Sequence, residues 1–288
     1  MEIKMNRLNV IACLSILLSV SADAAELGPC RDVNSIADID GSTQKYVLRL
    51  PQDFNNSQPH NLLVGLHGHG SDRWQYAQAT QWREIVATRD FAAEHNMILA
   101  SPDYRAKTSW MGPKAEADVL QIINDLKKQY KINKVFICGA SMGGTGALTF
   151  TALHPDFVDG VISMNGTANF LEYENFQDTV SASFGGTKAQ IPLEYKKRSA
   201  EYWPERFTMP VGITTSGRDE LVPSQSVRRL ADVLKKMQRP VMLIYREREG
   251  HRTSYEDAKT ILEFVIKSAD AKPPQATQAC PRPAGIAI

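Results

Sequence analysis

Short runs of β-branched and aliphatic residues alternate along this chain with longer amphipathic segments. This alternation is typical of parallel strands joined by crossover helices, so it predicts an α/β fold with a mostly parallel central sheet and helices on both faces. Several runs are apolar throughout, as expected for strands that are buried on both sides. The predicted strands span residues 45–50, 61–67, 97–102, 134–139, 160–165, 211–216 and 241–246.

The segments between these strands carry apolar residues at helical spacing, as Val119, Ile122, Ile123 and Leu126 do. No repeat or low-complexity linker divides them, so we expect one α/β domain over 45–267, preceded by an N-terminal segment over 26–44. The predicted helices span residues 81–95, 116–130, 224–237 and 254–267, with a further helix starting at Gly143.

Helical and strand periodicity both lapse between residues 167 and 209, where aromatic residues accumulate. A loop this long in a compact domain is usually functional or forms short helices of its own. We therefore expect a small cap-like insertion beside the site. A surface excursion packed by its own aromatic residues is the alternative interpretation.

The first residues have the composition of an export signal. Lys4 and Arg7 precede an apolar run that ends at Val20, and Ala22 and Ala24 form an A-x-A cleavage pattern. The run is shorter than the roughly 20 residues that a membrane-spanning helix needs, so cleavage is favoured over anchoring. We expect residues 1–25 to be a signal peptide, and the mature protein to be secreted or periplasmic without stable membrane insertion.

An oxidising compartment allows disulfides to persist. Cys30 and Cys280 lie near the two ends of the predicted mature chain, and domain termini often lie close together. We predict that they form a disulfide that ties down the C-terminal tail, residues 268–288. Cys138 falls within a predicted strand and is expected to be a buried thiol.

The net charge of the chain is +1 at pH 7. A nearly neutral chain gives no electrostatic reason to expect a nucleic acid or an acidic membrane as partner. Any ligand must therefore be identified from a local site. The oligomeric state cannot be predicted from these features.

The sequence Gly139-Ala140-Ser141-Met142-Gly143 lies between a predicted strand and a predicted helix. This is a G-x-S-x-G pattern in the strand–turn–helix context of a nucleophile elbow. Glycine-rich turns are common, so the pattern alone does not establish a reactive serine. Ser141 also needs a base to accept its proton, and that base needs a carboxylate to orient it.

Both partners follow later in the chain. Asp219 comes just after the predicted strand 211–216, where side chains converge on the ligand-binding edge of an α/β sheet. Its neighbour Glu220 is the alternative, although a solvated position suits Glu220 better. His251 lies between the last predicted strand and the last predicted helix. The order Ser141, Asp219, His251 predicts a serine–histidine–aspartate catalytic triad.

Such a triad also needs backbone N–H groups to bind the oxyanion of the tetrahedral intermediate. We expect one from Met142, the residue after the nucleophile, and the other from His69 in the glycine-rich sequence "HGHG". A metal site at His67 and His69 is the alternative, but no third ligand cluster accompanies the pair. No metal or cofactor is therefore expected. Trp110 and the aromatic residues of 167–209 are candidates for the substrate pocket.

Taken together, "HGHG", "GASMGG", Asp219 and the "GH" at 250–251 resemble the α/β-hydrolase superfamily over residues 45–267. The stretches "SPDYRAKTSWMGPKAEADVLQIINDL", "YKKRSAEYWPE" and "TTSGRDELVP" look like its esterase and prolyl oligopeptidase-related branch of secreted hydrolases. The chain is also similar to feruloyl and acetylxylan esterases and to polyester depolymerases. The resemblance implies acyl-transfer hydrolysis through an acyl-serine.

Three functions follow from this resemblance. The leading one is a serine esterase that acts on small-molecule or polymer-borne carboxylic esters. The second is a small peptidase or amidase with the same triad; a size-filtering peptidase is disfavoured, because too few residues precede residue 45 for the large propeller domain of such enzymes. The third is a non-catalytic binding protein on the same fold.

Overall fold

The computed structural model describes residues 25–271. The predicted signal peptide lies outside these residues except for Ala25, and so do most of the predicted tail and Cys280. The disulfide between Cys30 and Cys280 therefore stays a prediction. Within residues 25–271, no helix is both long enough and apolar enough to cross a membrane.

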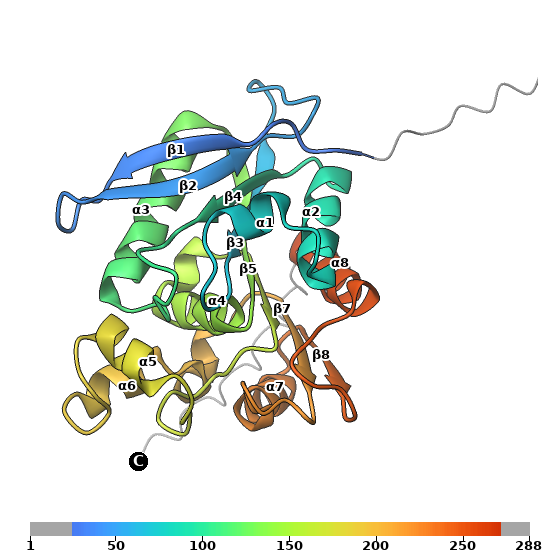
Figure 1. The fold of residues 1–288 in the computed structure, drawn as a ribbon. Helices are drawn as coiled ribbons and strands as arrows, with labels where there is room; N and C mark the ends of the chain where they lie inside the picture. The colour runs from blue at the N-terminus through green and yellow to red at the C-terminus, as the bar shows by residue number, and fades with distance from the viewer. Residues whose placement is uncertain (1–24, 272–288) are drawn as a thin grey trace, which may run out of the picture.

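An 8-stranded sheet forms the centre of the molecule, in the order β1-β2-β4-β3-β5-β6-β7-β8 (Figure 1). β2 pairs antiparallel with β1 and β4, and every other pairing is parallel. The carboxyl ends of the parallel strands consequently meet at one edge. The strands are β1 (Arg31–Ile36), β2 (Thr43–Arg49), β3 (His60–Leu66), β4 (Ile98–Pro102), β5 (Ile132–Ala140), β6 (Gly160–Met164), β7 (Val211–Ser216) and β8 (Val241–Arg246).

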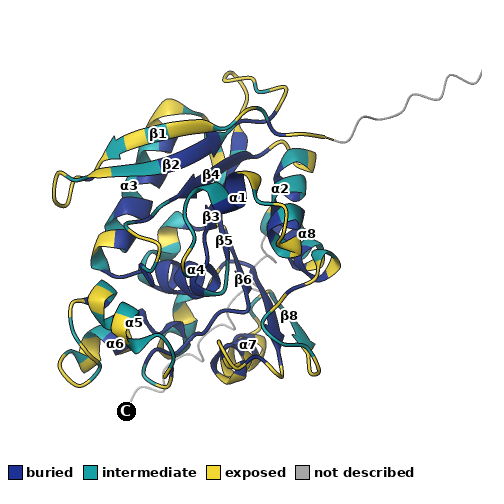
Figure 2. Cartoon of the chain, in the orientation of Figure 1, coloured by how far each residue is buried: buried dark blue, intermediate teal, exposed yellow. Residues whose placement is uncertain are grey.

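Helices cover both faces of the sheet and bury a separate apolar layer on each. On one face lie α3 (Pro113–Gln129), α4 (Met142–Leu153) and α7 (Gln225–Lys236). On the other lie α1 (Trp74–Gln78), α2 (Arg83–Glu94) and α8 (Tyr255–Asp270). Figure 2 shows the result: the central strands and α4 are buried, whereas helices such as α3 and α7 expose their outer sides.

The alternation of side chains along the strands produces the two layers. In β3, Leu62, Val64 and Leu66 pack against the α3 side, whereas Leu63 packs against the α2 side. Successive side chains of a strand point to opposite faces, so a strand covered on both sides is apolar at every position. This explains the continuous apolar runs of the sequence.

Each predicted strand and helix is present, with bounds that differ by a few residues. α3 begins at Pro113, earlier than expected, because proline suits the first turn of a helix. The sequence analysis did not predict β1. Its side chains are exposed or half-buried at the sheet edge, so "RDVNSI" lacks the apolar run used to predict the other strands.

The region 167–209 forms a small helical insertion between β6 and β7, drawn in yellow in Figure 1. It contains α5 (Gln177–Phe184), α6 (Pro192–Arg198) and two short 3-10 helices. Its aromatic residues Phe170, Tyr173, Phe184 and Tyr195 are buried in the same apolar layer as α3 and α4.

A buried arginine fastens this insertion to the domain. The Arg198 side chain is only 1% exposed and forms ion pairs with Glu194 (2.6 Å) and with Glu116 of α3 (2.7 Å). Its guanidinium also donates to the carbonyl oxygen of Met111 at 2.7 Å. A buried cation is tolerated only when it is paired and hydrogen-bonded in this way.

The first turn of α4 lies against the end of β3, and Gly143 makes this approach possible. A Cβ atom at Gly143 would lie 1.9 Å from the carbonyl oxygen of Leu66 and 2.9 Å from that of His67. Both obstacles are backbone atoms, which cannot move away as a flexible side chain can. Only glycine fits at this position.

We predict that Gly143→Ala lowers the free energy of unfolding by at least about 3 kcal/mol, because the methyl group forces α4 away from the sheet. Urea unfolding followed by circular dichroism measures this change. Gly250→Ala is the control, since its Cβ would meet only the Arg218 carbonyl oxygen at 3.9 Å. Equal unfolding midpoints for the two variants would contradict the prediction.

Candidate active site

Ser141 is the only residue between the end of β5 and the start of α4. Its backbone has φ 59° and ψ −122°, a conformation that is strained for a residue with a side chain. Two hydrogen bonds hold it: the Ser141 N–H donates to the Met164 carbonyl oxygen (2.8 Å), and the Ser141 carbonyl oxygen accepts from the Thr145 N–H (3.0 Å). The strained turn projects the hydroxyl beyond the sheet edge.

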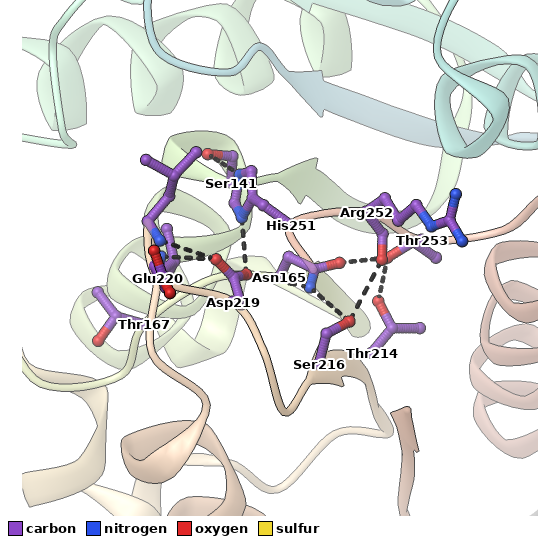
Figure 3. Close-up of polar contacts among 12 residues, drawn as sticks. Ser141, Asn165, Thr167, Thr214, Ser216, Asp219, Glu220, His251, Arg252 and Thr253 are labelled. Carbon is purple, nitrogen blue, oxygen red and sulfur yellow. Dashed lines mark hydrogen bonds and ion pairs between the residues drawn. The ribbon is translucent and has the colours of Figure 1, made fainter. Parts of the chain in front are cut away.

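The three side chains predicted to form a triad lie in one hydrogen-bonded row (Figure 3). Ser141 Oγ is 2.8 Å from His251 Nε2. On the opposite side of the ring, His251 Nδ1 is 2.7 Å from Asp219 Oδ2. Ser141 follows β5, Asp219 follows β7 and His251 follows β8, so the row is supplied by the carboxyl ends of three strands on one side of the sheet, with β6 between β5 and β7.

The Asp219 carboxylate is completely enclosed and fully hydrogen-bonded. Its side chain is 0% exposed. Oδ1 accepts from the N–H groups of Leu221 (3.1 Å) and Val222 (2.9 Å), and Oδ2 accepts from His251 and from Asn165 Nδ2 (3.3 Å). These donors hold the carboxylate in a fixed orientation. The neighbouring Glu220 is exposed, so Asp219 and not Glu220 lies beside His251.

The sequence analysis missed Asn165, which connects the loops below this row (Figure 3). Its Nδ2 donates to Asp219 and to Ser216 Oγ (3.2 Å), and its Oδ1 accepts from Thr253 Oγ1 (2.6 Å). Asn165 is 3% exposed and has a left-handed φ of 48°. One indication of Asn165 is present in the sequence: it is a polar residue followed by glycine, at the end of β6, the strand that pairs with β5.

The loop after β3 presents a free amide next to the serine. The N–H of Gly68 donates to Gln75 Oε1, and the N–H of Gly70 donates to the Lys107 carbonyl oxygen, both at 2.8 Å. Within residues 25–271, no protein acceptor takes the N–H of His69 or that of Met142. These are the two amides that the sequence analysis expected to bind an oxyanion.

A cavity of about 350 Å³ opens at Ser141 and His251. This size suits a small ligand. Its lining residues are Gly68, His69, Gly70, Ser71, Gln75, Trp82, Glu84, Ala140, Ser141, Asn165, Phe176, Leu221, His251 and Arg252.

Trp110, expected to help form the pocket, does not line this cavity and is 0% exposed. Its ring packs 5.6 Å from that of Phe176, and its Nε1 donates to Thr179 Oγ1 at 3.0 Å. The Trp110 indole therefore packs against the insertion and is not available to a substrate. Phe176 contacts the cavity instead, with its ring 4.4 Å from that of His69.

Burial shifts the pKa values of three groups near the serine. It lowers the pKa of His67 and of His69, which favours their neutral forms. Burial also raises the pKa of Glu84, although the nearby His251 opposes this shift.

The metal site weighed for His67 and His69 has no further ligands. The His67 ring is fully buried, with its nitrogens 2.9 Å and 3.2 Å from the carbonyl oxygens of Gly68 and Asp103. In the part of the chain that the structure describes, no group of three or more His, Cys, Asp or Glu residues converges as metal ligands would.

Comparison with solved structures shows the α/β-hydrolase fold that the sequence analysis expected. The chain is similar to FphF, a fluorophosphonate-binding serine hydrolase of Staphylococcus aureus, with 19% identity and a TM-score of 0.65 over 83% of this chain and 99% of that one. A ferulic acid esterase matches with 16% identity and a TM-score of 0.62 over 83% and 98% of the two chains.

The acylaminoacyl peptidase of Pyrococcus horikoshii is also similar, with 17% identity and a TM-score of 0.66. The match covers 84% of this chain but only 42% of the peptidase. At these identities the likeness shows the fold alone. No curated protein sequence matches the chain significantly.

The family assignment comes from sequence. The model of the prolyl oligopeptidase family matches residues 104–271, more than half of the chain, and the match includes Ser141, Asp219 and His251. The chain therefore belongs to the prolyl oligopeptidase family and is a serine hydrolase of the α/β-hydrolase type.

Proposed function

We propose that this protein hydrolyses carboxylic esters through an acyl-serine intermediate on Ser141. The observation that carries the proposal is the hydrogen-bonded row from Ser141 Oγ through His251 to Asp219, with distances of 2.8 Å and 2.7 Å. A serine hydroxyl is a weak nucleophile at neutral pH unless an oriented base removes its proton.

In this mechanism Ser141 Oγ attacks the ester carbonyl carbon while His251 Nε2 accepts the hydroxyl proton. Asp219 holds the imidazole through Nδ1 and stabilises its charged form. The N–H groups of His69 and Met142 bind the oxyanion. The tetrahedral intermediate then collapses, and His251 returns the proton to the departing alcohol.

Deacylation repeats these steps with water as the nucleophile. His251 accepts a proton from the water molecule, which attacks the acyl-serine carbonyl, and the same amides bind the second oxyanion. Release of the carboxylic acid restores the Ser141 hydroxyl. Each side chain thus acts in both halves of the reaction.

An amidase or peptidase is the second candidate, because the chain belongs to a family named for an oligopeptidase. The proposed machinery is the same for both, but an amine leaves only after His251 protonates it. Hydrolysis of an amide therefore requires the leaving nitrogen to lie within reach of His251 more strictly than hydrolysis of an ester requires this of the leaving oxygen.

Ser141→Ala is expected to lower kcat for p-nitrophenyl acetate by at least about a thousandfold, because no acyl-enzyme can form. A fluorophosphonate probe should label the unaltered protein at Ser141, as located by peptide mass spectrometry, and should not label the variant. Circular dichroism checks that the variant is folded. Full turnover by Ser141→Ala would exclude the mechanism.

Matched esters and amides with the same acyl group should separate the two candidate functions. We expect kcat/KM for the ester to exceed that for the amide by more than about a hundredfold, since alcohols leave more readily than amines. The p-nitrophenyl ester and the p-nitroanilide of one acyl group allow the same optical measurement. Comparable values for the two substrates would favour the amidase.

Asn165→Ala is expected to lower the free energy of unfolding by about 1–3 kcal/mol, because it removes three buried hydrogen bonds. Asn165 also positions Asp219, so kcat should fall about tenfold with KM changed less than about twofold. Asn133→Ala, at an exposed side chain near the other end of β5, is the control. A stability loss without the fall in kcat would limit Asn165 to a structural role.

A further inference from the structure

A second hollow of about 680 Å³ adjoins the cavity at Ser141, with His251 on the border of both. The two spaces share four lining residues, Trp82, Glu84, His251 and Arg252. In the proposed reaction the departing group receives its proton from His251. The second hollow, which His251 borders, is therefore where a leaving group would extend.

Glu84, the second residue of α2, is the unpaired acid shared by the two spaces. Its carboxylate takes part in no ion pair or side-chain hydrogen bond among residues 25–271, and His251 is the one charged group that affects its pKa. Burial raises that pKa, which reflects poor hydration of the carboxylate. Its own backbone N–H also acts on the carboxylate, but no side-chain cation does so by an ion pair within residues 25–271. Such a half-buried carboxylate is well suited to bind a cation.

Two of the three arginines around the second hollow are paired with carboxylates, and the third, Arg83, packs on an aromatic ring. Arg246 binds Asp257 at 2.6 Å and 2.9 Å, and Arg252 Nε binds Glu249 at 2.6 Å. The Arg83 guanidinium lies 5.4 Å from the centre of the Tyr255 ring. Glu256 is exposed at the rim and adds a further negative charge. Within residues 25–271, no arginine or lysine forms an ion pair with Glu84.

Trp82 supplies the other half of a cation site. Its side chain is 39% exposed, which is uncommon for so large an aromatic group, and it lines both spaces together with Glu84. The face of an indole attracts ammonium groups, and a carboxylate nearby strengthens the attraction.

We propose that Trp82 and Glu84 form a leaving-group subsite that selects substrates with a cationic, ammonium-type leaving group. This inference rests on the proposed function and makes Glu84 the residue that determines specificity. The alternative role of Glu84 is to stabilise the N-terminus of α2, where an acidic residue is favourable. That role would affect stability but not the choice between substrates.

Two esters of equal shape test the proposal: 2-(trimethylammonio)ethyl acetate, and its uncharged isostere 3,3-dimethylbutyl acetate. The unaltered protein is expected to have a kcat/KM about five- to tenfold higher for the charged ester. In Glu84→Gln, which keeps the Trp82 indole, the ratio should fall severalfold. Glu94→Gln, at the other end of α2 and paired with Lys259, is the control and should keep the ratio.

The preference should also depend on pH. Glu84 attracts a cation only when it is ionised, so the ratio is expected to fall as the pH is lowered through its raised pKa. Ionisation of His251 affects both esters alike and cancels from the ratio. A ratio of one in the unaltered protein, or an unchanged ratio in Glu84→Gln, would overturn the proposal.

Labelling of Ser141 by a fluorophosphonate tests the subsite without ester turnover. Tetramethylammonium chloride should slow labelling of the unaltered protein more than sodium chloride at equal ionic strength does, and this difference should fall severalfold in Glu84→Gln. If neither ester is hydrolysed but tetramethylammonium still protects Ser141 from the fluorophosphonate, only the ester function would be overturned. Ester turnover without preference or protection would overturn only the subsite.

Discussion

The close approach of α4 to the carboxyl end of β3 is the constraint on which the rest of this structure depends. Gly143 allows the helix backbone to contact the Leu66 carbonyl oxygen, and the turn before it must then adopt the strained conformation of Ser141. A strain of about 1–3 kcal/mol persists only where the surroundings enforce it. Here the sheet on one side and the packed helix on the other fix the serine between them.

The remaining polar groups reach Ser141 because the parallel strands all end at the same edge. Asn165, Asp219 and His251 follow β6, β7 and β8, and the amide of His69 follows β3. Hydrogen bonds among these loops help to set their positions, together with the N–H groups of Leu221 and Val222 in the loop of Asp219 itself. A buried network of this kind is stable only if every member is satisfied, and the Asp219 carboxylate meets that requirement with four donors.

Most of the sheet could be predicted from the sequence, because strands buried on both faces are apolar at every position. Ser141, Asp219 and His251 could be predicted as partners from a turn motif and from their order in the chain. The sequence did not predict β1, whose half-exposed residues carry no apolar run. Trp110 was expected in the pocket, but its burial depends on how the insertion folds. Asn165 was missed because its partners on other loops come together only in three dimensions.

The burial of Arg198 has a consequence for how substrates reach Ser141. Swinging the insertion outward would break the ion pair between Arg198 and Glu116 of α3 and the hydrogen bond from Arg198 to the Met111 carbonyl oxygen. Because the Arg198 side chain is buried, losing these partners is unfavourable, so the insertion acts as a fixed wall and not as a hinged flap. Phe176, which belongs to this insertion and lines the cavity, then keeps its place, so a substrate must fit beside its ring without displacing it.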